Sequence, residues 1–131
     1  MATMQVDVVS AEARLFSGEA EAVVARSLEG EIAILPGHQP ALLALAKAPV
    51  RIRTAEGDDV DVAVHNGFLE VSDNQLTVLA DIAELATEID VNRAKAARRR
   101  AEQHLADPDY TGDAQAELDR AQLRLRLAGT E

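Results

Sequence analysis

The stretch Glu29-Gly30-Glu31-Ile32-Ala33-Ile34-Leu35-Pro36-Gly37-His38-Gln39-Pro40 decides how the first part of the chain folds. Its apolar residues 32–35 form a short run of the length that a β-strand needs. Pro36-Gly37 then predicts a type II turn, because proline presets φ at about −65° and glycine accepts the positive φ that follows. Pro40 excludes a helix here and favours an extended Gln39. The stretch therefore predicts a strand, a tight turn and a second extended segment.

Similar short strands lie on both sides of this stretch. Apolar residues alternate with polar ones, or form short runs, in segments separated by turn residues: 5–9, 20–25, 32–35, 42–45, 50–53, 60–64, 68–71 and 76–79. A spacing of about 8 to 12 residues between such segments predicts an antiparallel β-sandwich or barrel. Asn66-Gly67 predicts a type I′ hairpin turn, and Ser72-Asp73-Asn74 a further turn. Phe16 and Phe68 are expected to be the largest side chains of the core.

The period changes near Asp81 and then indicates two helices. The first is expected to be capped by Asp90, to end before Pro108 and to carry an apolar face of Ala94, Ala97, Ala101 and Leu105. The second is expected to begin at Asp113, with an apolar stripe of Ala114, Leu118, Ala121, Leu125 and Ala128. The fold class is therefore α+β, an antiparallel β-sandwich in residues 1–84 followed by an antiparallel αα-hairpin in residues 85–131. A hairpin this small is expected to dock on the sandwich or on another protein.

The composition excludes several classes of function. The chain has no cysteine, which removes disulfides, thiol catalysis and thiolate metal sites. The three histidines have no partner at metal-ligand spacing, and no P-loop, nucleophile elbow or dinucleotide-binding motif is present. The formal net charge of −10 argues against nucleic-acid binding. The apolar runs are too short to span a bilayer, so no membrane insertion is expected. The residues alone indicate a binding or structural module.

Charge divides the chain into two unlike parts. Residues 1–84 contain fourteen acidic and five basic residues, whereas residues 85–131 contain nine and eight. The basic residues of the second part form two clusters: Arg93, Lys95, Arg98, Arg99 and Arg100, then Arg120, Arg124 and Arg126. A basic helix face is either simply solvated or meets an acidic partner or a phosphate.

Four stretches, in order along the chain, match the pattern of a known family. They are Asp7-Val8-Val9-Ser10-Ala11-Glu12 with Phe16-Ser17-Gly18, then residues 29–40, then Gly67-Phe68-Leu69-Glu70-Val71 with Val78-Leu79-Ala80-Asp81, and last Ile89-Asp90-Val91-Asn92-Arg93-Ala94. Each stretch alone is a weak signal, but their shared order makes a strong one. Together they resemble the epsilon subunit of the bacterial F-type, proton-translocating ATP synthase.

That resemblance implies a non-catalytic rotor subunit of the central stalk, peripheral on the cytoplasmic face of the bacterial membrane. In the family, the sandwich contacts the gamma subunit and the c-ring, and Ser10, Glu31 and His38 are the expected contact residues here. For His38, capping of its own turn is an equally good explanation. The family's helical hairpin either lies folded or extends toward the alpha and beta catalytic subunits, where it hinders ATP hydrolysis. The expected end of the second helix near Gly129 implies weaker insertion than in the longest-tailed members.

The resemblance also implies a regulatory ATP, with no obligatory cofactor. The Ile-Asp-x-x-Arg-Ala motif is the stretch at which some bacterial members bind ATP. The candidate ligands are Glu84, Asp90, Arg93, Arg99, Arg124 and Arg126. A planar guanidinium suits phosphate, and a carboxylate accepts from an adenine amino group or a ribose hydroxyl. The competing interpretation is that Asp90 is only a helix cap and Arg93 an exposed helix residue.

Two further functions compete with the rotor subunit. One is a free-standing nucleotide-sensing module in which the hairpin closes over a nucleotide. The other is a β-sandwich adaptor with no role in energy coupling. Co-purification with a gamma subunit and a c-ring separates the rotor-subunit interpretation from both alternatives.

Overall fold

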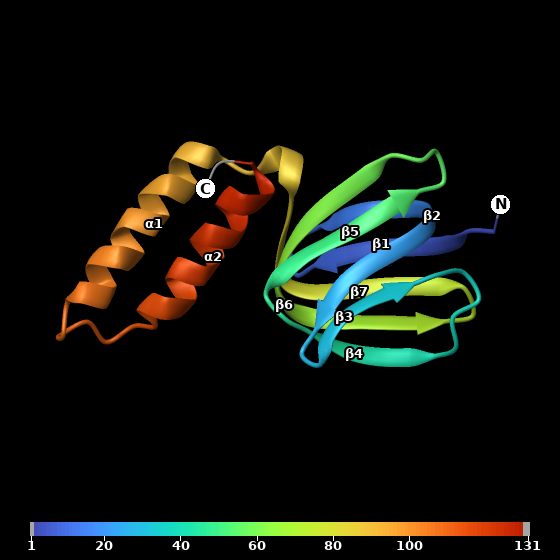
Figure 1. Ribbon diagram of the computed structural model, residues 1–131, viewed down its shortest axis with the longest axis horizontal. Helices are drawn as coiled ribbons and strands as arrows, with labels where there is room; N and C mark the ends of the chain where they lie inside the picture. The colour runs from blue at the N-terminus through green and yellow to red at the C-terminus, as the bar shows by residue number, and fades with distance from the viewer. Residues whose placement is uncertain (1, 130–131) are drawn as a thin grey trace. The chain divides into compact units, whose positions relative to one another are not determined.

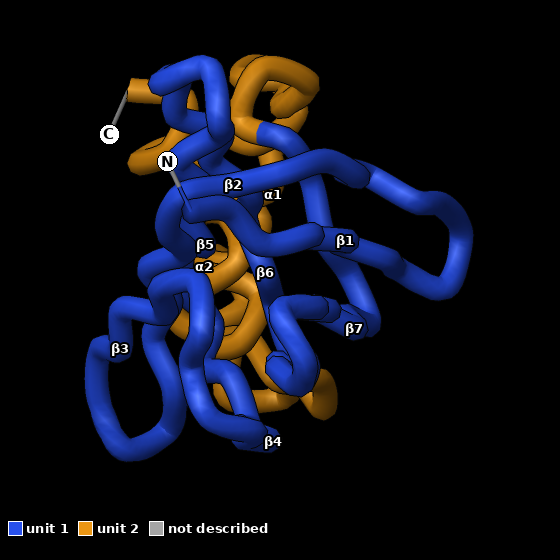
Figure 2. Tube along the Cα trace, turned by 90° about the vertical axis from the view of Figure 1, so that its right-hand side faces the viewer, with its two compact units in different colours: residues 1–85 blue, residues 86–131 orange. Residues whose placement is uncertain are grey.

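The computed structural model describes residues 2–129, and the chain divides into a strand unit that ends at Leu85 and a helical unit that starts at Ala86 (Figures 1 and 2). Each unit is described by itself. The strand unit contains β1 (Met4–Ser10), β2 (Arg14–Ser27), β3 (Gly30–Ile34), β4 (Ala41–Leu45), β5 (Ala48–Thr54), β6 (Asp59–Ser72) and β7 (Gln75–Leu85). The helical unit contains a short 3-10 turn (Ala86–Glu88), α1 (Val91–Ala106) and α2 (Ala114–Leu127). The predicted fold class, a β-sandwich followed by a helical hairpin, is confirmed.

Two long strands each serve both layers of the sandwich (Figure 1). The first half of β2 pairs with β1, and its second half pairs with β3 and β5. Likewise β6 pairs first with β5 and then with β4, while β7 follows β6 along most of its length. These pairings are antiparallel, but β1 and β7 run parallel, from Gln5 opposite Gln75 to Ser10 opposite Ala80. The parallel pair closes the sandwich between the first and last strands described.

The core lies between the layers and consists almost wholly of aliphatic side chains. Its fully buried members include Val6, Val8, Ile34, Ile52, Leu69 and Leu76. The prediction that Phe68 belongs to the core is wrong, because that side chain is 54% exposed. Leu69 and Val71 point inward, and alternation along β6 therefore turns Phe68 outward. Phe16 packs against the core while remaining partly exposed.

The turn at Pro36-Gly37 forms as predicted. Gly37 has φ of 85°, and the backbone N–H of His38 donates to the carbonyl of Leu35 at 3.2 Å. The N–H of Gly37 also donates to Oδ1 of Asn74 at 2.7 Å, so this turn is tied to the turn between β6 and β7. In that second turn Asp73 and Asn74 have φ of 52° and 59°, the pair of positive values typical of type I′.

The predicted hairpin turn at Asn66-Gly67 is wrong, because β6 continues through both residues. The register against β7 shifts at this point, which is a β-bulge rather than a reversal of the chain. A Cβ on Gly67 would collide with the carbonyl oxygen of Leu79 and lie 2.9 Å from Cα of Ala80. Glycine is therefore required by the close approach of β7, and not by a positive φ.

The helical unit forms the predicted antiparallel hairpin. Asp90 and Asp113 cap the two helices, with side chains that accept from the N–H of Arg93 and of Ala116. The expected apolar faces are largely correct, with Ala94, Ala101, Ala114, Ala121 and Leu125 buried. The prediction that Leu105 belongs to the apolar face of α1 is wrong, because its side chain is 48% exposed, while its neighbour His104 contacts α2. Leu123 is also buried, outside the expected stripe.

Candidate functional site

An exposed apolar surface covers the outer face of β4, β6 and β7. It is formed by Leu28, Leu42, Ala44, Phe68 and Leu79 and is called the apolar surface below. Phe68 lies directly opposite Ala44 on one side and Leu79 on the other. The N–H of Leu28 donates to the carbonyl of Ala44 at 3.1 Å, which places the β2–β3 turn beside β4. The four large side chains are 54% to 72% exposed. A contiguous apolar patch of this kind is typical of a protein-binding site.

A groove of about 520 Å³ runs along this surface at the bulge of β6. Its walls include Leu28, Phe68 and Leu79, together with Ser10 at the end of β1 and Asp81 within β7. Ser10 is held there by its own turn, because its Oγ accepts from the N–H groups of Glu12 and Ala13, each at 3.3 Å. The groove suits an apolar side chain of a partner.

The three predicted contact residues do not form one cluster. Ser10 lines the groove, and Glu31 is exposed on β3, opposite Arg26 and close in sequence to Leu28. His38 is in the Pro36-Gly37 turn, which Asn74 connects to Thr3 at the start of β1. Ser10 is at the other end of β1, about 20 Å away at the usual rise per residue. For His38, Nδ1 lies 2.7 Å from the carbonyl oxygen of Gln39, a local contact within its turn.

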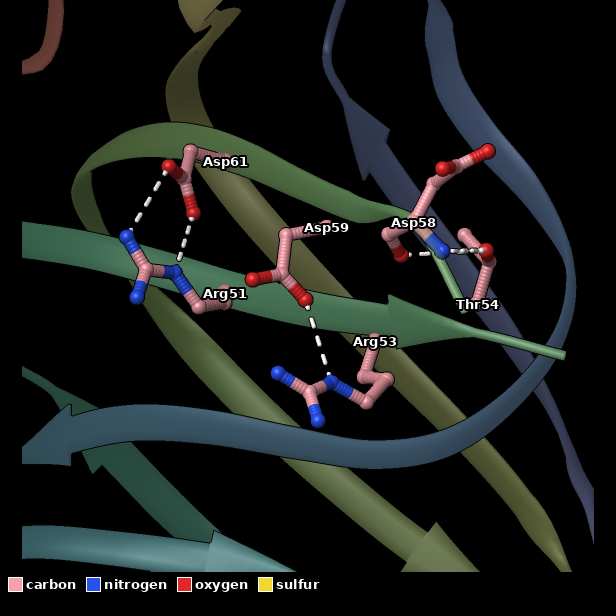
Figure 3. Close-up of polar contacts among 6 residues, drawn as sticks. All are labelled: Arg51, Arg53, Thr54, Asp58, Asp59 and Asp61. Carbon is pink, nitrogen blue, oxygen red and sulfur yellow. Dashed lines mark hydrogen bonds and ion pairs between the residues drawn. The ribbon is translucent and has the colours of Figure 1, made fainter. Parts of the chain in front are cut away.

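The outer face of β5 and β6 is charged, in contrast to the apolar surface. Arg51 and Asp61 are cross-strand partners whose Nε and Oδ1 are 2.9 Å apart, and Arg53 is 3.2 Å from Asp59 in the next pair (Figure 3). The hydrogen bond and the charge of Asp61 raise the pKa of Arg51. Exposed ion pairs of this kind keep a face hydrated, so partner binding is expected on the apolar surface.

The candidate nucleotide ligand Glu84 belongs to the strand unit. Its Oε1 lies 3.1 Å from Nε2 of His65, a side chain that is only 1% exposed. His65 lies two residues after Ala63, the cross-strand partner of Glu84, and alternation along a strand puts positions 63 and 65 on the same side. Among the described side chains, Nδ1 of His65 has no hydrogen-bond partner.

The other five candidate ligands lie on the helical unit. Asp90 acts as the cap of α1, with Oδ1 3.1 Å from the N–H of Arg93. Contact between His104 and Glu117 fixes the register of the antiparallel helices, so the start of α1 and the end of α2 share one end of the hairpin. The candidates at this open end are Asp90, Arg93, Arg124 and Arg126. Arg99 is about 9 Å further along α1 than Arg93 and on another side of the helix.

A cluster at the opposite end of the hairpin was not predicted. The Nδ1 of His104 is 2.9 Å from Oε1 of Glu117, and the hydroxyl of Tyr110 donates to Oε2 of the same carboxylate. The rings of His104 and Tyr110 stack with centroids 3.9 Å apart. The hydrogen bond from Tyr110 lowers the pKa of Glu117 most, and the bond from His104 adds to that effect. The Tyr110–Glu117 hydrogen bond also raises the pKa of Tyr110. These residues are 6 and 7 positions apart, a spacing that carries no helix or strand signal.

No three histidine, cysteine, aspartate or glutamate side chains within residues 2–129 are grouped so as to hold a metal ion. No helix of that region is long and apolar enough to cross a membrane.

A β-sandwich with an apolar outer face, followed by a helical hairpin that carries clusters of basic residues, defines a two-part binding subunit. Family models support this class. Residues 3–86 match the ATP synthase delta/epsilon chain β-sandwich domain, and residues 87–129 match the long α-helix domain of the same chain. The chain belongs to the family of ATP synthase delta/epsilon chains and is a non-catalytic subunit of an ATP synthase. The resemblance found in the sequence is confirmed.

Individual relatives agree with this assignment. The ATP synthase epsilon chain of Streptomyces avermitilis is 48% identical over 125 residues, which cover 95% of this chain and 94% of the relative. That of Brevibacillus brevis is 50% identical over 107 residues, 82% of this chain and 81% of the relative.

Solved structures share the fold at lower identity. A chain of the Euglena gracilis mitochondrial ATP synthase matches with a TM-score of 0.72 and 20% identity, over 95% of this chain and 76% of that one. A chain from the structure of the Tetrahymena thermophila mitochondrial ATP synthase central stalk and c-ring matches with a TM-score of 0.60 and 18% identity, over 94% of this chain and 94% of that one.

Proposed function

We propose that the strand unit holds this subunit in the central stalk by binding the gamma subunit through the apolar surface, and that it also contacts the c-ring. The observation that supports this is the row of Leu28, Phe68 and Leu79 around the groove, exposed on a unit whose other described outer face carries ion pairs. Ser10 and Glu31 lie toward the same end of the strand unit and extend the contact. We also propose that the complex lies on the cytoplasmic face of a bacterial membrane; in support, the similar epsilon chains of Streptomyces avermitilis and Brevibacillus brevis come from bacteria.

Replacing Phe68 with Ser tests this surface. An aromatic anchor in an interface contributes about 2 kcal/mol or more, so Phe68→Ser should weaken binding to purified gamma subunit roughly thirtyfold. Leu105→Ala is the matched control, because that side chain is similarly exposed but belongs to the helical unit. Equal affinity of the parent and Phe68→Ser would show that gamma binds elsewhere.

A second proposal concerns the helical unit, which restrains ATP hydrolysis by the alpha and beta subunits and binds a regulatory ATP at its open end. The supporting observation is that Asp90, Arg93, Arg124 and Arg126 share that end of the hairpin. The guanidinium groups provide the charge that a triphosphate needs, and Asp90 provides an acceptor. Glu84 is a further candidate from the strand unit, where it contacts His65.

Titration calorimetry on the isolated chain tests the nucleotide site. Arg93→Ala should lose about 1.5 to 3 kcal/mol of ATP binding, the usual value of a charge-assisted contact. Lys95→Ala is the control, since Lys95 is an exposed cation of the same helix outside the motif. If the parent shows no heat of binding at millimolar ATP, or if Arg93→Ala and Lys95→Ala bind ATP with the same affinity, then Asp90 serves only as the helix cap.

A further inference from the structure

The buried side chains of α1 are small, whereas α2 buries Leu123 and Leu125 as well as Ala114 and Ala121. In α1 the buried residues are Ala94 and Ala101, and each presents a single methyl group. Small side chains let two helices approach closely but remove little apolar area from water. Contacts other than the burial of α1 side chains therefore also contribute to the pairing of α1 with α2.

Polar and ring contacts link the helices at the closed end of the hairpin, where three elements meet. His104 comes from α1, Tyr110 from the connecting loop and Glu117 from the first turn of α2. Both oxygens of the carboxylate are engaged, one by the ring of His104 at 2.9 Å and the other by the hydroxyl of Tyr110. The imidazole and phenol rings stack at 3.9 Å with an angle of 9° between their planes. Each residue thus contacts the other two.

The connecting loop is shaped around the phenol ring. A Cβ on Gly112 would lie 2.6 Å from Cζ and 2.8 Å from Cε1 of Tyr110, well inside van der Waals contact. Gly112 therefore leaves the space that the ring occupies, while Asp113 caps α2 immediately afterwards with an oxygen 3.0 Å from the N–H of Ala116. The loop, the cap and the three side chains form one connected arrangement.

We infer that His104, Tyr110 and Glu117 form a clasp that keeps α1 and α2 paired. Hydrogen bonds to a carboxylate are stronger than those between neutral groups, and here they join elements on both sides of the loop. The clasp concerns regulation only if the proposed restraint of hydrolysis holds. The pairing itself is a property of the isolated chain.

Distance measurements between spin labels on the two helices test the clasp. The chain has no cysteine, so cysteines introduced at Lys95 and Gln122 are the sole labelling sites; both positions are exposed. In the parent we expect one short, narrow distance distribution. Tyr110→Phe removes the hydroxyl donor but keeps the ring, and it should increase the long-distance fraction several-fold. Glu117→Gln, which removes the charge, should increase it further.

Gln115→Ala is the matched control, because Gln115 donates to Asp119 at 2.9 Å within α2 and joins nothing to α1. Its distance distribution should equal that of the parent. Unchanged distributions in both clasp variants overturn the inference. A long-distance population that appears together with loss of helical circular dichroism also overturns it, because the cluster then stabilises the helices and not their pairing. Hydrolysis by the assembled complex is a separate measurement: separated helices with unaltered hydrolysis would support the clasp and contradict the regulatory proposal.

Discussion

Replacing Gly67 with alanine should destabilise the sandwich through one added methyl group. The new Cβ would lie 2.9 Å from Cα of Ala80 and 3.1 Å from the carbonyl carbon of Leu79. Both are backbone atoms of β7, which is hydrogen-bonded to β6 on one side and to β1 on the other. A side chain can rotate away from such a contact, but a strand held on both sides has to shift.

The magnitude follows from two opposing effects. Overpacking that moves backbone costs about 1 to 3 kcal/mol. The alanine also restricts the unfolded chain, which returns about 0.4 to 1 kcal/mol. We therefore expect Gly67→Ala to lower the free energy of unfolding by about 1 to 2 kcal/mol, or to lower the urea midpoint by about 1 M.

Urea unfolding followed by far-UV circular dichroism measures the difference. Gly18→Ala is the control, because a Cβ on Gly18 of β2 makes only ordinary contact, 3.4 Å from the ring of Phe16. That variant should be neutral or slightly stabilised. Equal stability of the two variants would refute the close approach of β7 to Gly67. A loss in Asn66→Ala as large as that in Gly67→Ala would instead support a hairpin turn at these residues.

Three other changes have expected outcomes. Asp90→Ala removes the cap of α1 and should cost the helical unit about 1 kcal/mol, measured by thermal loss of helical circular dichroism. Arg51→Ala breaks an ion pair whose arginine side chain is 60% exposed, so it should cost at most about 1 kcal/mol, and the difference from the parent should vanish in high salt. Hydrogen bonds from Tyr110 and His104 lower the pKa of Glu117 in the folded chain. The stabilisation that ionised Glu117 gives the folded hairpin is therefore complete above the ordinary glutamate pKa and is lost as pH falls through the lowered pKa of the folded state. Acid titration of the α1–α2 spin-label distance distribution should show that loss in the parent and not in Glu117→Gln.

Sequence reasoning succeeded where one local rule determined the outcome. The Pro36-Gly37 turn, the Asp90 cap and the end of α1 before Pro108 each follow from backbone chemistry within a few residues. Sequence reasoning failed where a strand distant in the sequence determined the local backbone structure. Gly67 has a strong turn signal, but its role depends on Leu79 and Ala80, and no pattern within β6 shows how closely β7 approaches.

The candidate sites show the same limit. The hydrophobicity of Phe68 suggested the core, whereas its exposure depends on the alternation set by Leu69 across the bulge. The clasp was missed because His104, Tyr110 and Glu117 meet only when the loop reverses the chain. The nucleotide motif could be found from sequence, since Asp90 and Arg93 lie within one helical turn. Whether that motif binds ATP depends on affinity, which a motif does not encode.

The parallel pairing of β1 with β7 has a consequence for the order in which the chain folds. β1 is synthesised first and can pair at once with β2, but its other partner follows about 70 residues later. Until β7 is made, one edge of β1 remains open to pairing with other chains. Pairing over such a distance is also slow, because loop closure precedes the gain from contacts. We therefore expect the sandwich to complete its folding late and to be most prone to aggregation just before the last strand is added.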